Sequence, residues 1–503
     1  MAFAVCKVYN RICYETICRG HLFDPGIFSI KEAQMLFSSI PFLFYFLPVV
    51  LICYFAVPRV AKNAVLFLAS LVFYAWGEPR YVLLMAASIL VGYIAGILIE
   101  KNKGRKIQKF ILGIAIALCI AALAYFKYAD FFISSFNAAT KLSVPLLKIA
   151  LPIGISFYSF QIISYLVDVY RGDTAAQKNF IKLGAYVAMF PQLIAGPIVR
   201  YSDIAEQLTN RKQSFEQVLE GIKRFIIGLS KKILIANVLG EFVDKFRNVA
   251  EPTVCLYWAY AVVFSLHLYF DFSGYSDMAI GLGRILGFTF PENFNYPFIS
   301  GSITEFWRRW HMSLGSWFRD YVYIPLGGNR VSKIKWIRNI LIVWALTGFW
   351  HGADWTFIIW GLLFALLLML EKTPFGKFIK KCKPVAHIYV FAVILLSFVI
   401  FNSGSVTQME ADLKGLFGVA GIPVWNDITG YYVKSYAAVI IIASIGATPL
   451  PAILIKKLFA HKEKAVVSVI YSIAEVVFVL GLLIICTSFL VDGSFNPFLY
   501  FRF

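Results

Sequence analysis

One histidine stands in a polar stretch where its ring could take part in chemistry. His351 lies within 346–355, at the junction of two apolar runs, and Asp354 follows it by three residues. Residues three apart on a helix share a face, and a carboxylate beside an imidazole fixes its tautomer and stabilises its protonated form. We therefore predict that His351 is a general base oriented by Asp354. The alternative is a core histidine bonded to a carbonyl oxygen.

A second stretch, 304–321, interleaves arginines with tryptophans. An arginine fork suits phosphate oxygens. Arg308, Arg309 and Arg319, together with Trp307, are therefore candidates for binding a phosphate-bearing acyl donor such as acyl-CoA at a cytoplasmic mouth. The alternative is an interfacial helix anchored by snorkelling arginines and a tryptophan belt.

Acidic and hydroxyl side chains gather in 269–278, where an apolar run ends. This cluster contains Asp271, Ser273, Ser276 and Asp277. These side chains could line a polar entry to a cavity. Because Asp, Ser and Gly favour turns, the cluster could equally cap a buried turn. The sequence leaves both interpretations open.

The elements that position these residues must be membrane helices. The chain has 503 residues, is 60% hydrophobic and 15% charged, and has a mean hydropathy of +0.73. Soluble proteins are roughly 45–50% apolar and about 25% charged. Long apolar runs occupy 40–57, 82–99, 110–126, 254–270, 355–370, 387–401 and 466–490. A spanning helix needs roughly 17–25 such residues, so we predict an all-α polytopic protein with about 10–13 transmembrane helices. The absence of apolar/polar alternation argues against a barrel.

The charge distribution predicts an orientation. The net charge is +19, from 47 Lys and Arg against 28 Asp and Glu. The basic residues concentrate in short loops, for example 101–109, 377–383 and 456–464. This is the positive-inside pattern, which places these loops in the cytoplasm. It points to contact with membrane lipid and not to nucleic-acid binding. The eight cysteines show no zinc-ligand spacing, so no metal site is predicted.

The chain divides into zones and not into soluble domains. Residues 35–503 form one predicted membrane domain, with the candidate catalytic zone at 146–361. That zone is interrupted by Gly, Pro and charge, and 151–158 and 190–197 suggest broken or re-entrant backbone around a central funnel. Residues 1–34 lack a signal-peptide core. We expect this N-terminal extension either to be dispensable or to come from an upstream start codon and not be native, because Met35 leads directly into the first apolar run.

Five ordered blocks carry a family resemblance. They are 151–158 (LPIGISFY), 190–198 (FPQLIAGPI), 271–281 (DFSGYSDMAIG), 307–311 (WRRWH) and 347–352 (TGFWHG). In this order they resemble the membrane-bound O-acyltransferase family, and within it the bacterial alginate O-acetylation branch. The resemblance implies a cytoplasmic acyl donor such as acetyl-CoA, a tunnel through the bacterial inner membrane, and His351 as the catalytic histidine, with His311 in a supporting role. It also implies an extracytoplasmic partner of the SGNH-hydrolase type and a polysaccharide as final acceptor.

The last residues carry a separate resemblance. Residues 498–503 read Phe-Leu-Tyr-Phe-Arg-Phe. This is similar to a short C-terminal acyl-transfer motif on a small companion protein in the D-alanylation of teichoic acids. The similarity implies that Tyr500 relays the acyl group as a phenolic ester. The alternative is an aromatic anchor at the membrane interface.

A transporter or flippase is the competing class of function. Broken helices with intramembrane charges are typical of such proteins. The polar residues here are concentrated in one zone, however, and no inverted repeat is evident in the sequence. An assay for acyl-CoA-dependent transfer discriminates the two classes, because a transporter releases no CoA.

Overall fold

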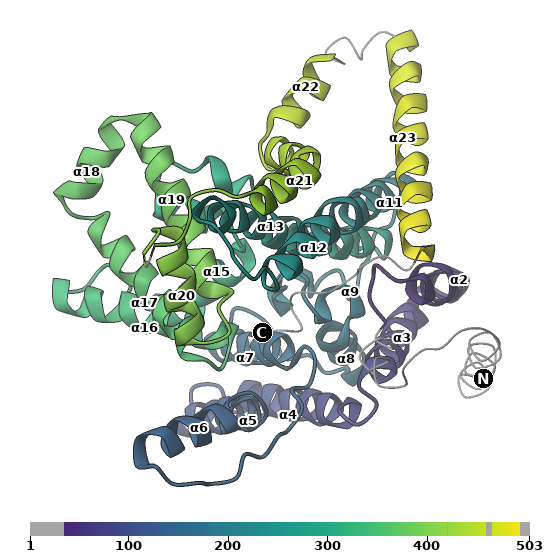
Figure 1. Ribbon diagram of the computed structural model, residues 1–503. Coiled ribbons are helices and arrows are strands. Elements are labelled where there is room, and N and C mark those ends of the chain that lie inside the picture. Colours follow the sequence, from purple (N-terminus) through teal and green to yellow (C-terminus); the bar gives the residue numbers. More distant parts are fainter. Residues whose placement is uncertain (1–34, 420, 459–464, 493–503) are drawn as a thin grey trace, which may run out of the picture.

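The computed structural model describes residues 35–419, 421–458 and 465–492. Within these ranges every regular element is a helix, which confirms the all-α prediction (Figure 1). Seven helices are long and apolar enough to cross a membrane, and Pro41–Ala56 and Trp355–Leu370 are shorter apolar helices. The seven are Arg59–Gly77, Val82–Lys101, Lys106–Thr140, Val254–Ile285, Lys383–Phe401, Asp427–Gly446 and Ser468–Val491. The chain is thus a multi-pass membrane protein. The extension 1–34 lies outside the described residues.

The N-terminal zone consists of apolar helices with few interruptions. In Figure 1, α4, α5 and α6 lie together along the lower edge of the molecule. Two short π-helical segments, η2 and η4, adjoin longer helices. The elements of this zone are η2 (Pro41–Phe46), α2 (Leu47–Ala56), η3 (Arg59–Ala61), α3 (Lys62–Gly77), α4 (Val82–Lys101), α5 (Lys106–Leu123), η4 (Ala124–Tyr128) and α6 (Ala129–Thr140).

The central zone has more elements than the N-terminal zone, and many of them are short. Its elements are α7 (Ile155–Arg171), α8 (Phe180–Ala188), α9 (Phe190–Leu193), α10 (Tyr201–Ile204), α11 (Phe215–Ser230), η5 (Lys231–Ala236), α12 (Asn237–Phe246), α13 (Val254–Ile285), η6 (Pro297–Ile299), α14 (Ile303–Arg309), α15 (Met312–Phe318), η7 (Arg319–Tyr323), α16 (Lys333–His351) and α17 (Trp355–Leu370). Gly154 precedes α7 with φ +74°, and a Cβ there would lie 2.8 Å from the carbonyl oxygen of Leu193. The two predicted breaks therefore pack against each other, and glycine permits both the conformation and the approach.

The polar cluster at 269–278 does not form a turn. Helix α13 runs through it without interruption for 32 residues, so the turn interpretation is wrong. Asp271 forms an ion pair with Lys232 at 2.5 Å, and Asp277 pairs with Lys231 at 2.6 Å. The lysines of η5 compensate the carboxylates, which lets the helix continue through the protein interior.

Helix α13 packs closely on α11 through small residues. A Cβ on Gly221 would lie 2.7 Å from the carbonyl oxygen of Gly281, and one on Gly228 would lie 2.6 Å from that of Gly274. Small residues at such positions let two membrane helices approach until their backbones touch. This contact fixes α11, and η5 directly after it, against the central helix.

The C-terminal zone returns to simpler helices. It contains α18 (Pro374–Lys381), α19 (Lys383–Phe401), α20 (Val406–Leu416), α21 (Asp427–Gly446), α22 (Leu450–Leu458) and α23 (Ala465–Val491). Helix α23 stands at the margin of the molecule, on the right in Figure 1. An ion pair between Lys223 and Glu475 links it to α11.

Helix directions define two faces of the molecule. The basic stretch 101–109 contains the loop 102–105 between α4 and α5, and a Cβ on Gly172, just after α7, would lie 3.2 Å from Nζ of Lys103. We call this side the basic face. Helices α16 and α17 form an antiparallel hairpin in which a Cβ on Gly361 would lie 2.3 Å from the carbonyl oxygen of Trp344. Helix α16 begins in the basic stretch 330–338, which we assign to the basic face. His351 is the last residue of α16 and therefore lies at the opposite end of the hairpin, on the side that we call outer.

Candidate active site

His351 is the last residue of α16. Its ring packs edge-on against Trp350, Trp360 and Phe401, with ring centroids 4.9, 5.2 and 5.2 Å away. Gly352 follows in an extended conformation and ends the helix. Aromatic packing therefore fixes the orientation of an imidazole that stands at the tip of a helical hairpin.

Asp354 lies on a different helix from His351. It is the N-cap of α17, and its Oδ1 accepts hydrogen bonds from the backbone N–H of Thr356 at 2.9 Å and from the hydroxyl of Thr356 at 3.0 Å. The expectation of a shared helix face is wrong, because the chain breaks at Gly352. The carboxylate instead satisfies the first backbone donors of α17. It thereby orders the turn that follows His351.

His311 is buried beside the same aromatic cluster. It is 2% exposed and sits between α14 and α15 with φ +46°. Its Nδ1 lies 3.1 Å from Oδ1 of Asn293, which also accepts the backbone N–H of Ser313 at 3.2 Å. Since that oxygen is an acceptor, Nδ1 of His311 is the protonated nitrogen. The Trp350 ring lies 6.0 Å from His311 and 4.9 Å from His351, so the fold brings both predicted histidines around one tryptophan.

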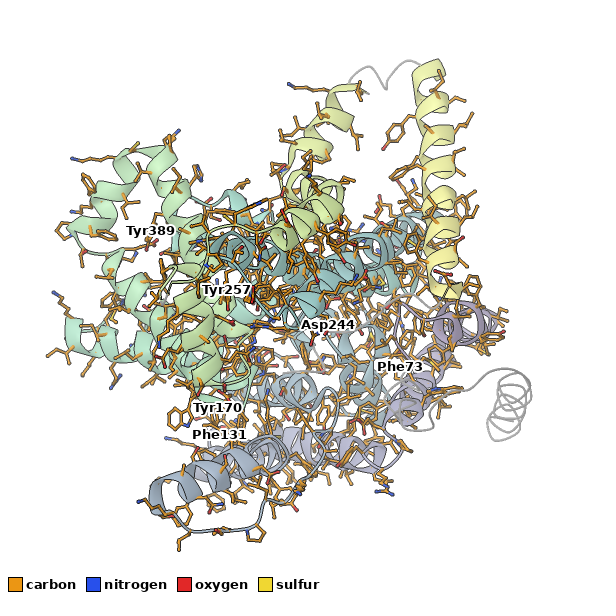
Figure 2. The ribbon with its side chains drawn as sticks, viewed as in Figure 1. Phe73, Phe131, Tyr170, Asp244, Tyr257 and Tyr389 are labelled. Carbon is orange, nitrogen blue, oxygen red and sulfur yellow. The ribbon has the colours of Figure 1, made fainter. Side chains whose placement is uncertain are left out.

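A large cavity opens on the outer side of the turn after His351. This outer cavity has a volume of about 650 Å³. Its polar lining includes Asp244, Arg247, Asp354, Asn402 and Gln408. Asp244 comes from α12 near the middle of the molecule (Figure 2). The cavity thus offers hydrogen-bond donors and acceptors on the side away from the basic face.

A smaller space of about 90 Å³ borders His351 directly, and we call it the histidine pocket. It is lined by the broken segment 151–157, by Ile194, and by Trp350 and His351. Lys127 and Leu151 line both this pocket and the outer cavity. The predicted backbone breaks therefore border the candidate base, next to the larger outer cavity.

A third space lies on the basic face. This basic-face pocket, about 280 Å³, is lined by Asp168, Arg171, Arg200, Asp320 and Tyr321, among others. The two guanidinium groups lie over the Tyr321 ring at 5.4 and 5.3 Å, and Arg200 pairs with Asp320 at 2.8 Å. Burial alone would raise the pKa of the Asp320 carboxyl, but hydrogen bonds from Arg319 and Arg200 outweigh burial and hold that pKa below its ordinary value.

Stacked rings fill the space between the basic-face pocket and His351. Trp317 lies 5.2 Å from Tyr321 and stacks on Phe160 at 3.8 Å. Phe160 in turn lies 5.6 Å from Trp350, next to His351. The column thus connects the two regions through aromatic side chains in contact with one another.

Known proteins resemble this chain over most of its length. The profile of the membrane-bound O-acyltransferase (MBOAT) family matches residues 174–403. The chain is 45% identical over 377 residues to the probable alginate O-acetylase AlgI of Azotobacter vinelandii. The aligned region covers 73% of this chain and 75% of that protein. The chain belongs to the membrane-bound O-acyltransferase family.

More distant relatives extend the likeness to other acceptors. The peptidoglycan O-acetyltransferase of Helicobacter pylori is 35% identical over 431 residues, covering 78% of this chain and 82% of that protein. The teichoic acid D-alanyltransferase of Bacillus subtilis is 34% identical over 243 residues, and the aligned region covers 46% of this chain and 61% of that protein. The predicted family and the acyltransferase class are confirmed, and nothing supports the transporter alternative.

In this O-acyltransferase the predicted donor-binding residues do not form one group. Arg319 bonds to Asp320 at 2.6 Å, at the edge of the basic-face pocket. Arg309 pairs instead with Glu305 at 2.9 Å, on its own helix. Arg308 is exposed and is not among the residues that line that pocket.

The tryptophans of this stretch do not form an interfacial belt. Trp307 packs against Trp344 and Phe364 at 4.9 and 4.8 Å. Trp310 and Trp317 are each 5% exposed and belong to the core. The belt interpretation is therefore wrong for these side chains, because the rings are buried among other helices of the protein.

Sequence reasoning missed four polar residues of this region: Lys127, Arg171, Arg200 and Asn293. A signal existed for two of them. Lys127 lies within the candidate span Lys106–Thr140. Arg171 is the last residue of the largely apolar helix α7, which also contains Asp168. Charge within an apolar segment is a functional indication by itself. Arg200 and Asn293 lie in loops, and only the tertiary structure brings them to the site.

Proposed function

We propose that this enzyme is an O-acetyltransferase that takes an acetyl group from acetyl-CoA at the basic face and transfers it, beside His351, toward acceptors on the outer side. The single observation that carries the proposal is the position of His351. It ends a helix that begins at the basic face, and it borders a pocket that adjoins the outer cavity. A base placed there serves two substrates that arrive from opposite sides of the membrane.

The donor would bind at the basic-face pocket. Arg171 and Arg200 present guanidinium groups there, and Arg319 lies beside them through Asp320. Guanidinium forks suit the phosphates of CoA, and the Tyr321 ring is a surface on which a base could stack. The acyl-pantetheine arm would then follow the aromatic column toward His351. In this proposal Arg308, Arg309 and Trp307 support the mouth and do not contact the donor phosphates directly.

The chemistry needs one base and one nucleophilic hydroxyl. His351 accepts the hydroxyl proton as the oxygen forms its bond to the thioester carbonyl carbon, the C–S bond then breaks, and the thiolate of CoA takes up the proton. His311 supports the site from the inner side, held by Asn293. Asp354 contributes by fixing the turn after His351, since its carboxylate caps α17.

The C-terminal motif supplies a candidate hydroxyl. Tyr500 lies outside the described residues. Helix α23 starts after the basic stretch 456–464 and ends at Val491, and the positive-inside rule applied to that stretch supports an outer location for the final segment. We include in the proposal that Tyr500 accepts the acetyl group as a phenolic ester. An extracytoplasmic SGNH-type protein would then move it to a polysaccharide.

The relatives support this assignment of acceptor and location. Two of them are named for O-acetylation of alginate and of peptidoglycan, which are both polysaccharide polymers. By this similarity the acceptor is an exported or cell-surface polysaccharide, and the enzyme resides in a bacterial inner membrane. Membrane lipid covers its apolar helices.

The test replaces His351 with Ala in the full-length enzyme reconstituted in lipid. CoA release from acetyl-CoA should fall by about 10²–10⁴-fold, the range expected for a lost general base. His387→Ala is the matched control. His387 lies on α19, and its Nδ1 is 3.1 Å from the carbonyl oxygen of Ser300. It lines none of the three spaces described above. Wild-type CoA release by His351→Ala would refute the proposed role of His351.

A further inference from the structure

Lys127 places an ionisable amine inside the longest candidate membrane span of the described residues. The candidate span Lys106–Thr140 has 35 residues, and its apolar 18-residue stretch has a mean hydropathy of 2.3. A lysine within such a segment is costly and needs partners that offset the cost. Lys127 lies in η4, a π-helical turn between α5 and α6. Such turns occur frequently at functional sites.

The partners of Lys127 are the carbonyl groups that end α16. Its ammonium donates to the carbonyl oxygen of Trp350 at 2.5 Å and to that of His351 at 3.4 Å. The last carbonyls of a helix lack N–H partners within the helix, and a cation beside them also interacts favourably with the helix dipole. The lysine thus acts as a C-terminal cap supplied by another part of the chain.

The neighbouring residue extends the same clamp. The hydroxyl of Tyr128 donates to the carbonyl oxygen of Phe349 at 2.7 Å, and the two rings stack at 3.9 Å. Two consecutive residues of η4 therefore hold three consecutive carbonyls of α16. The clamped turn is the one that carries the His351 imidazole.

Ordinary ion pairing does not account for Lys127. Within the described ranges, no carboxylate forms a salt bridge with it. The side chain instead borders the histidine pocket together with His351, and the outer cavity together with Asp354 and Arg247. It stands where these two spaces meet.

We propose that Lys127 is a positioning residue for acyl transfer, which holds the last turn of α16 so that the His351 ring stays at the junction of the histidine pocket and the outer cavity. This inference rests on the proposed role of His351. Lys127 exchanges no proton in the reaction and acts through the backbone that it binds. A displacement of a catalytic group by about 1 Å can cost on the order of 10²-fold in rate.

The experiment compares Lys127→Met with Lys127→Arg in the full-length enzyme in lipid. Met keeps the volume and loses both carbonyl bonds, whereas Arg keeps the cation and its donors. We expect Lys127→Met to lower kcat by about 10–10²-fold with KM for acetyl-CoA unchanged, and Arg to recover most of the loss. The matched control is Lys182→Met, because Lys182 donates to the hydroxyl of Thr209 at 3.1 Å, away from His351. It should keep wild-type kcat and KM.

Three results would overturn the proposal: wild-type kcat for Lys127→Met, a loss confined to KM, or an Arg variant no better than Met. If Lys127→Met does not fold, Tyr128→Phe tests the same clamp. Its kcat must fall while KM stays constant, and an unchanged kcat overturns the proposal. The assignment of His351 is tested separately. An inactive His351→Ala enzyme beside a fully active Lys127→Met enzyme would refute only the positioning role.

Discussion

The two histidines of the site are held in different ways. His311 donates from Nδ1 to Asn293, and its ring lies edge-on to Phe272 at 4.7 Å. The His351 ring is fixed by aromatic packing, and its nitrogens make no hydrogen bond with the described part of the chain. A ring nitrogen beside a cavity, held in orientation but without a protein partner, is available to an incoming hydroxyl. This difference supports His351 as the base and His311 as the supporting residue.

The orientation of His311 should depend on Asn293. Besides His311 and Ser313, Asn293 bonds to the hydroxyl of Ser276 at 3.1 Å. Asn293→Leu removes the acceptor for Nδ1, and we expect CoA release to fall by about 10–10²-fold, as when a hydrogen-bond partner that orients a functional histidine is lost. Ser276→Ala is the control, since it removes one partner of Asn293 and leaves His311 bonded. Equal activity of Asn293→Leu and wild type would contradict the role assigned to His311.

At the scale of elements, paired charges join helices in the central zone. The side chains of Lys232 and Asp271 are each 2% exposed and pair at 2.5 Å between η5 and α13. The adjacent Lys231 pairs with Asp277, which also pairs with Arg224 of α11 at 2.8 Å. These ion pairs fix the position of η5 along α13, next to the loop that carries Asn293.

Breaking the buried pair should destabilise the fold more than removing it whole. Lys232→Met leaves a buried carboxylate without its cation and should cost about 3–5 kcal/mol of unfolding free energy. The double variant Lys232→Met with Asp271→Leu should recover most of that loss. Thermal unfolding in detergent measures both. Lys414→Met, which breaks an exposed pair with Glu410, should leave the midpoint unchanged. A double variant no more stable than Lys232→Met would contradict this account.

At the scale of the whole molecule, the proposed function has to solve a transport problem. The basic-face pocket and the outer cavity lie on opposite sides, and CoA is too polar to cross the bilayer between them. An acetyl group carried on a tethered side chain avoids that crossing. Twelve residues, 492–503, follow α23 in the sequence, and a fully extended chain of that length spans at most roughly 40 Å, on the scale of the bilayer thickness.

The relay through Tyr500 predicts a covalent intermediate. After incubation with acetyl-CoA, mass spectrometry of the C-terminal peptide should find acetyl on Tyr500 in the wild type and none in His351→Ala. Tyr500→Phe should lose both this label and cell-surface O-acylation, because it lacks the phenolic oxygen. Ser494→Ala serves as the control for a nearby hydroxyl. Near-normal surface O-acylation in a Tyr500→Phe strain would contradict the relay and leave the enzyme class intact.

The sequence by itself determined the properties that depend on local composition. Apolar run lengths specify membrane helices, because each span must satisfy its own backbone in lipid. Gly and Pro at 151–158 and 190–197 marked the broken backbone, since these residues restrict which conformations the chain can adopt. The motif around His351 likewise located the candidate base.

Only the tertiary structure decided which side chains meet. Sequence spacing suggested that Asp354 orients His351, but the break at Gly352 makes Asp354 a helix cap instead. Lys127 bonds to carbonyls more than 220 positions away in the chain. Contacts of this kind depend on how helices pack, and local periodicity carries no information about a partner that distant in sequence.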